Sequence, residues 1–160
     1  MNTIGKNFWV TLRIVLGLIF LYSALNSIFG FTGEGPGWIN GGGSPTFGYL
    51  NFAAYGPFAG IFKAMAGNPI VDILHVGGQL LIGISLLLGV GLRIAGYAGA
   101  LQMMLIYLSA FPPPFNPILD EHIVYAIVLV GIAVLRPGEV LGLGKIWSEM
   151  EVVKNYPILQ

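Results

Sequence analysis

The chain has 160 residues, of which 56% are hydrophobic and 9% are charged, and its mean hydropathy is +0.82. This composition leaves too little polar surface to solvate a water-soluble globule of that size, so it predicts an integral protein of the cell membrane. Seven basic and seven acidic residues cancel, which gives no reason to expect a nucleic-acid partner. The absence of cysteine excludes disulfides, CxxC redox motifs, thiolate metal sites and covalently attached haem.

Four apolar stretches are long enough to cross a bilayer, which takes about 20 helical residues. The second and the fourth open with Asn-Pro, at Asn68 and Asn116, and this pair favours a helix start. The third ends at a triple proline, which cannot continue a helix. The sequence therefore predicts an all-α, integral membrane four-helix bundle in which residues 1–160 form one domain, with spans at residues 8–28, 69–92, 94–111 and 117–135.

The segment between the first two spans is expected to hold one short helix. Residues 30–45 are rich in glycine and read as a loop. After this loop, Phe58, Ile61, Phe62 and Met65 recur at helical spacing, with Lys63 on the opposite face. This pattern predicts a short interfacial helix on the outer leaflet.

The basic residues predict the orientation of the four spans. Only Lys63 falls on one side of a four-pass arrangement. By the positive-inside rule, the opposite side, with both termini, is expected to be cytoplasmic. The basic residues on that side are Lys6, Arg13, Arg93, Arg136, Lys145 and Lys154.

Ionisable residues inside a span are unfavourable by roughly 2.5 kcal/mol or more at mid-helix, so each one is a functional candidate. On the second span, Asp72 and His75 are three residues apart and share a helix face, and Gln79 extends the same stripe. A carboxylate can orient one imidazole nitrogen and leave the other for a proton, a quinone oxygen or a metal.

A second candidate cluster opens the fourth span, where Asp120, Glu121 and His122 are followed by Tyr125. The spacing allows Glu121, His122 and Tyr125 to lie on neighbouring faces. If the second and fourth spans are neighbours, both histidines and their acids would converge near the outer surface, where they could bind a quinone head group or release protons.

Structural roles compete with these functional ones. Asp72, Asp120 and Glu121 fall in first helical turns, where the helix dipole favours negative charge. The histidines lack the spacing of known metal motifs, so no metal ligands are assigned, although a haem or metal is not excluded. Arg13 lies only about 8 Å inside the first helix, where it could extend to the cytoplasmic interface and serve topology alone.

Several segments resemble the DoxX/DoxD family of small four-helix membrane proteins. They are LRIVLGLIFLYSALNSI in the first span, GGQLLIGISLLLGVGLRIAG across the second and third, and NPILDEHIVYAIVLVGIAVLRPGEVLGLGKIW at the end. The longer first loop with its PFAGIF segment is more similar to the DoxD branch. The first span departs from the family, which commonly has a glycine and a lysine there, because it ends with Asn26 and no lysine.

The DoxD resemblance implies the membrane subunit of a thiosulfate:quinone oxidoreductase, with a DoxA-like partner and quinone as electron acceptor. On this hypothesis His75 and His122 handle protons or bind quinone, and Asp72 and Glu121 orient them. The remaining candidates for the quinone site are Gln79, Tyr125, Asp120 and Arg13. The alternative is a non-catalytic accessory subunit that stabilises a terminal oxidase complex. A small-solute transporter is a weaker third reading, because no broken helices or inverted halves are evident.

Overall fold

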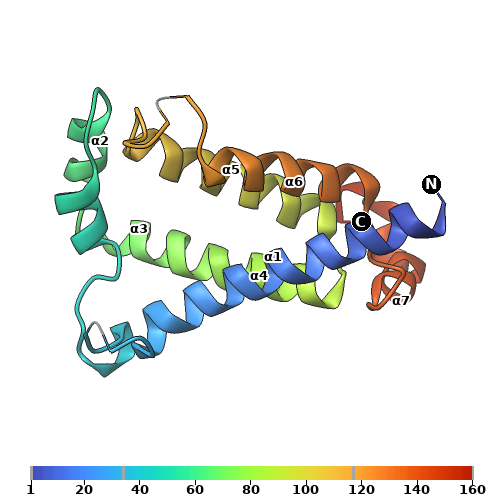
Figure 1. Ribbon diagram of the computed structural model, residues 1–160. Helices are drawn as coiled ribbons and strands as arrows, with labels where there is room; N and C mark the ends of the chain where they lie inside the picture. The colour runs from blue at the N-terminus through green and yellow to red at the C-terminus, as the bar shows by residue number, and fades with distance from the viewer. Residues whose placement is uncertain (1, 34, 117, 160) are drawn as a thin grey trace.

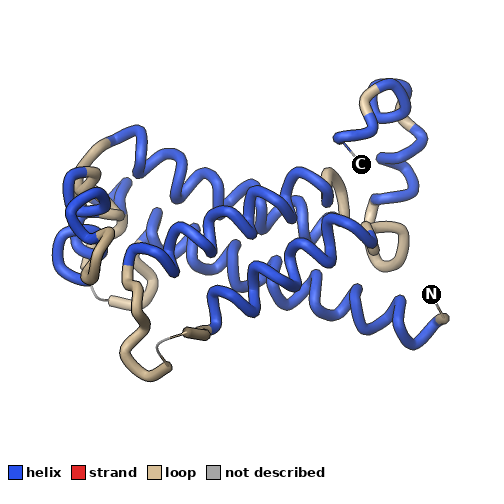
Figure 2. Tube along the Cα trace, turned by 90° about the horizontal axis from the view of Figure 1, so that it is seen from above, coloured by secondary structure: helices blue, strands red, loops and turns tan. Residues whose placement is uncertain are grey.

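The computed structural model describes residues 2–33, 35–116 and 118–159, and within them the chain is all-helical, as predicted (Figures 1 and 2). The long helices form four rods. They run back and forth, so that the two ends of the chain lie at the same end of the molecule. The second rod is a continuous helix in which η3 is a π-helical turn between two α-helical parts. The rods are α1 (Thr3–Phe29), the joined α3 (Pro69–Asp72), η3 (Ile73–Gly77) and α4 (Gly78–Leu88), α5 (Leu92–Ser109) and α6 (Glu121–Leu135).

Shorter helices occupy the two ends of the rods. The short helix predicted between the first two spans is confirmed as α2 (Ala59–Ala64), which stands across one end of the rods in Figure 1. The same loop contains η1 (Trp38–Asn40) and the π-helical η2 (Tyr49–Ala53). At the opposite end, α7 (Gly144–Glu149), α8 (Glu151–Asn155) and η4 (Pro157–Leu159) follow α6 and were not among the expected helices.

Capping residues explain where the first two rods begin and end. Asn2 caps α1, which therefore starts five residues before the expected span, and Gly30 ends it in a left-handed conformation. Asn68 accepts a hydrogen bond from the Ile70 amide, so the predicted start of the second rod is confirmed. Gly89, with φ of 72°, ends that rod after Leu88, four residues earlier than expected.

The fourth rod begins at Glu121 rather than at residue 117. Asp120 is its cap, because its Oδ1 accepts hydrogen bonds from the amides of His122 and Ile123. Asn116 instead closes a turn with the amides of Ile118 and Leu119. The proline of this Asn-Pro pair, Pro117, lies outside the described residues.

The rods follow one another around the bundle in the order α1, α4, α5 and α6, so α4 and α6 lie diagonally opposite each other. Packing is most extensive between α5 and α6 and between α1 and α4, α4 also packs on α5, and α1 touches α6 to a smaller extent. A single apolar core fills the centre, where side chains from all four rods meet. Its most buried members include Phe20, Leu86, Leu92, Leu129 and Ile132.

Glycines allow the two most extensive pairs to approach closely. A Cβ at Gly83 would stand 2.7 Å from the backbone nitrogen of Leu21 on α1. A Cβ at Gly96 would stand 2.5 Å from the carbonyl oxygen of Leu129 and 2.7 Å from the Ala133 Cβ on α6. Small residues at these positions let helix backbones come into contact, as is common between helices in membranes.

Apolar side chains cover the outside of the rods as well as the core. Within the described residues, two rods are long and apolar enough to span a membrane, Thr3–Phe29 and Pro69–Leu88, whereas Glu121–Leu135 is apolar but shorter. Outward-facing apolar residues nevertheless occur on all four rods. They include Leu18 and Tyr22 on α1, Leu74 and Leu81 on the second rod, Tyr97 and Leu101 on α5, and Ile127 and Val134 on α6.

Candidate functional site

Asp72 anchors the glycine-rich loop to the second rod. The carboxylate is buried, and its Oδ1 accepts hydrogen bonds from the Ser44 hydroxyl at 2.9 Å, the Thr46 hydroxyl at 2.6 Å and the Thr46 amide at 3.2 Å. Thr46 is buried as well. The hydrogen bonds of Asp72 therefore hold a loop that precedes it by 26 to 28 residues, and they give it a structural role beside the predicted one of orienting His75.

His75 lies in the π-helical turn and is hydrogen-bonded to Gln102 on α5. The Gln102 Nε2 donates to the His75 carbonyl oxygen at 2.9 Å and lies 3.2 Å from the ring Nδ1. If Nδ1 accepts this amide proton, a neutral His75 carries its own proton on Nε2. Gln102 therefore forms a bond between two helices, and its partner is a candidate site residue.

Gln79 joins the second rod to α1. Its Oε1 accepts a hydrogen bond from the Ser23 hydroxyl at 3.2 Å, and its side chain is buried. Asp72, His75 and Gln79 were expected to form one polar stripe. Their side chains instead contact three different parts of the chain, which are the glycine-rich loop, α5 and α1, respectively. The π-helical turn between Asp72 and Gln79 contributes to this spread, because it offsets the two residues from regular α-helical spacing.

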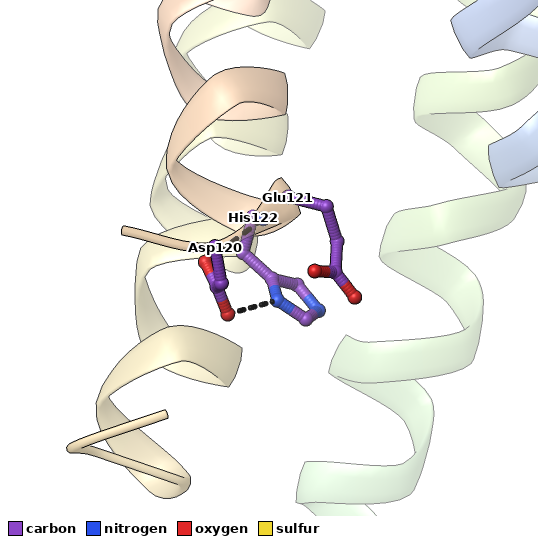
Figure 3. A group of neighbouring side chains, drawn as sticks. All are labelled: Asp120, Glu121 and His122. Carbon is purple, nitrogen blue, oxygen red and sulfur yellow. Dashed lines mark hydrogen bonds and ion pairs between the residues drawn. The ribbon is translucent and has the colours of Figure 1, made fainter. Parts of the chain in front are cut away.

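Asp120 and His122 form a close pair at the start of α6 (Figure 3). The Oδ2 of Asp120 lies 2.8 Å from the Nδ1 of His122, while Oδ1 caps the helix. An ionised carboxylate only accepts hydrogen bonds, so Nδ1 must carry the proton. Neutral His122 then presents an unprotonated Nε2, and the ring, about a quarter exposed, is accessible.

Glu121 completes a compact group with this pair. The ligand atoms of Asp120, Glu121 and His122 lie within 4.8 Å of one another, and Glu121 is exposed. In Figure 3 the Glu121 carboxylate and the His122 ring lie on the side of α6 that faces the light-green ribbon of the second rod. Tyr125, one turn further on, packs against the apolar core.

The two histidine clusters lie at the same end of the rods but on diagonal helices. The His75 end of the second rod and the first turn of α6 are both found at the end where α2 lies (Figure 1). However, α5 packs against both of these rods, and the hydrogen bonds of His75 go to α5. The second rod and α6 are therefore diagonal to each other and not adjacent, as a joint pocket would require. His75 is hydrogen-bonded to Gln102, and His122 is hydrogen-bonded to Asp120.

Arg13 lies in the half of α1 that belongs to the opposite end. Its side chain is fully buried, and Nη2 donates to the carbonyl oxygens of Leu141 at 2.7 Å and Val140 at 3.4 Å. The expectation that Arg13 extends to the interface is wrong, because the segment after α6 folds over its guanidinium. Its distance along α1 from the histidine end also separates it from the other candidates for a quinone site.

The structure adds residues that the sequence did not single out. Ser44 and Thr46 are polar positions in a glycine-rich loop, and nothing local in the sequence pairs them with Asp72. No family model matches the sequence, and no curated protein or solved structure matches the chain. The DoxX/DoxD resemblance consequently stays a prediction from the quoted segments.

Proposed function

We propose that the chain is a four-span membrane protein and that His122 exchanges protons with a quinone head group. The membrane part of the proposal is supported by the outward-facing apolar side chains on all four rods, because helices that are apolar on every side need lipid. α6 rises only about 22 Å, less than the ~30 Å hydrocarbon core. With Arg136 at the interface of its far end, the Asp120 end would lie within reach of lipid-dissolved quinone.

The observation that carries the catalytic part is the 2.8 Å contact between Asp120 Oδ2 and His122 Nδ1. It fixes the ring orientation and the tautomer, and it stabilises the imidazolium when Nε2 takes up a proton. Protonated Nε2 would then donate to a quinone oxygen. Glu121, exposed beside the ring, would return a proton from water.

The proposed reaction is balanced as a two-electron transfer. Two thiosulfate ions form one sulfur–sulfur bond to give tetrathionate and release two electrons, and quinone takes up these electrons with two protons to form quinol. Thiosulfate as the donor and a DoxA-like partner subunit follow from the DoxD resemblance. This chain would contribute the quinone site and its protons.

The test is quinone reduction by the purified protein in lipid nanodiscs, with thiosulfate and a soluble quinone analogue, alone and with a co-expressed partner subunit. We expect His122→Ala to lower turnover at least about 100-fold, since positioned general acids contribute roughly 10² to 10⁴. Asp120→Asn should lower turnover by less, because asparagine still caps the helix. His75→Ala shows whether the second imidazole takes part.

A matched pair of acids is the control. Glu121→Gln should slow turnover, whereas Glu149→Gln, the same change at the opposite end, should not. Unchanged turnover in His122→Ala and His75→Ala would remove both histidines from the mechanism.

The alternative, a non-catalytic accessory subunit of a terminal oxidase complex, is favoured by a different observation. Asp72, Gln79 and Gln102 are all used in contacts that hold the fold together. Absence of turnover in the wild type, together with stoichiometric co-purification with oxidase subunits, would support this role and contradict the quinone proposal.

A further inference from the structure

A pocket opens at the end of the rods that is opposite to the histidines. It has a volume of about 320 Å³ and lies between the start of α1, the turn from α4 to α5, and the segment that follows α6. Two basic side chains and one acidic side chain contribute to its wall. The polar and aromatic lining includes Lys6, Arg136, Glu139, Trp147 and Ser148.

A third cation, Arg13, lies directly behind the wall of this pocket. Val140, whose carbonyl oxygen accepts a hydrogen bond from Arg13, lines the pocket, as does Val10, one helical turn before Arg13. Gly89 also lines the pocket, and the space that its missing side chain leaves is filled by Nη1 of Arg13. Gly142 makes room for the same nitrogen on another side.

The Arg13 guanidinium is buried, and no carboxylate of the described residues forms an ion pair with it, that of Glu139 in the pocket wall included. Within the same part of the chain, its Nε and Nη1 have no hydrogen-bond partner. A buried charge is strongly unfavourable unless an opposite charge compensates it. The guanidinium contacts Gly89 and Val140, which both line the pocket, so an anion bound there would be close enough to compensate part of its charge.

We propose that this pocket binds the phosphate group of an anionic phospholipid. Lys6 would contact the phosphate, Ser148 offers a hydroxyl, and Arg13 supplies positive charge from behind. Apolar side chains line the same pocket, and two of them, Leu135 and Val140, are exposed. A cationic pocket beside apolar side chains at a helix-bundle end suits a lipid head group with its acyl chains.

The binding experiment uses the full chain in a neutral detergent. Short-chain phosphatidylglycerol, phosphatidylcholine and inorganic phosphate are titrated separately, and bound lipid and the melting temperature are measured by native mass spectrometry and thermal unfolding. We expect saturable binding of one phosphatidylglycerol with a higher melting temperature, and weaker binding of phosphatidylcholine. Competition by inorganic phosphate would show that the phosphate group alone is recognised, and its absence would show that the lipid is required.

Lys6→Ala is the main variant, because Lys6 is exposed and its truncation leaves the buried Arg13 in place. We expect it to weaken phosphatidylglycerol binding about fivefold, as one lysine near an anionic lipid contributes about that factor. The matched control is Lys145→Ala, which removes a charge from the same end outside the pocket lining. Equal affinity for both lipids, or equal loss in the two variants, would overturn the proposal. Neither measurement depends on quinone turnover.

Discussion

Replacing Gly96 by alanine is expected to lower the free energy of unfolding by about 2 kcal/mol, within the roughly 1–3 kcal/mol typical of overpacked cores. The added methyl group would meet the Leu129 carbonyl oxygen at 2.5 Å and the Ala133 Cβ at 2.7 Å, so α6 would have to move away from α5. Backbone atoms cannot turn aside as a flexible side chain can. Unfolding of the purified protein by increasing fractions of dodecyl sulfate measures this change.

A matched substitution separates overpacking from helix propensity. Gly77 lies in the second rod, and a Cβ there has nothing within 4 Å, so Gly77→Ala should be neutral or slightly stabilising. Ala133→Gly introduced together with Gly96→Ala should restore only part of the stability, because the Leu129 carbonyl remains in place. Equal stability of the Gly96 and Gly77 variants would show that α5 and α6 are not closely packed.

Asp72→Ala is expected to destabilise the fold by about 3 kcal/mol, because it removes the shared acceptor of three hydrogen bonds and leaves the buried donors of Thr46 without a partner. Hydrogen bonds to charged groups contribute about 1.5–3 kcal/mol each, and relaxation of the loop recovers part of their sum. The loop around Thr46 should exchange its amide hydrogens faster. Hydrogen–deuterium exchange and detergent unfolding together measure both effects.

Two milder variants refine the test at Asp72. Asp72→Asn keeps an oxygen at the acceptor position and should cause about half of the loss, and Thr46→Val removes one bond while it keeps the amide bond. If Asp72 also orients His75, quinone turnover should fall in Asp72→Asn by more than in Thr46→Val. An unchanged exchange rate around Thr46 in Asp72→Ala would contradict the anchoring role.

Composition and local capping signals were sufficient to predict the helical class. Apolar stretches separated by glycine and proline placed all four long rods, and the Asn-Pro pair at residue 68 marked a true helix start. The start of α6 predicted from the same pair at Asn116 was wrong. Asp120 is the cap, because its carboxylate accepts hydrogen bonds from two backbone amides of the first turn. Local signals cannot decide between two adjacent caps, since each forms its own turn.

The site was less predictable because its contacts are long-range. Asp120–His122 is local, and both members were recognisable in the sequence. The Asp72 contacts cross 26 to 28 residues, the His75 contact crosses 27 residues, and the Arg13 contact with Leu141 crosses 128 residues. Helix order around a bundle depends on how the surfaces pack as a whole, so the diagonal placement of α4 and α6 could not be derived from spacing alone.

The π-helical turn Ile73–Gly77 gives the second rod one residue more than a regular α-helix would have there. Loss of one residue within this turn would convert it into a regular α-helical turn and leave the orientation of the flanking parts unchanged. Loss of one residue within Gly78–Leu88 would instead rotate the part that follows by about 100° around the axis. A one-residue deletion in the turn should therefore keep the contacts of Asp72 with its loop and of Gln79 with α1, which makes this turn the place where the rod tolerates a change of length best.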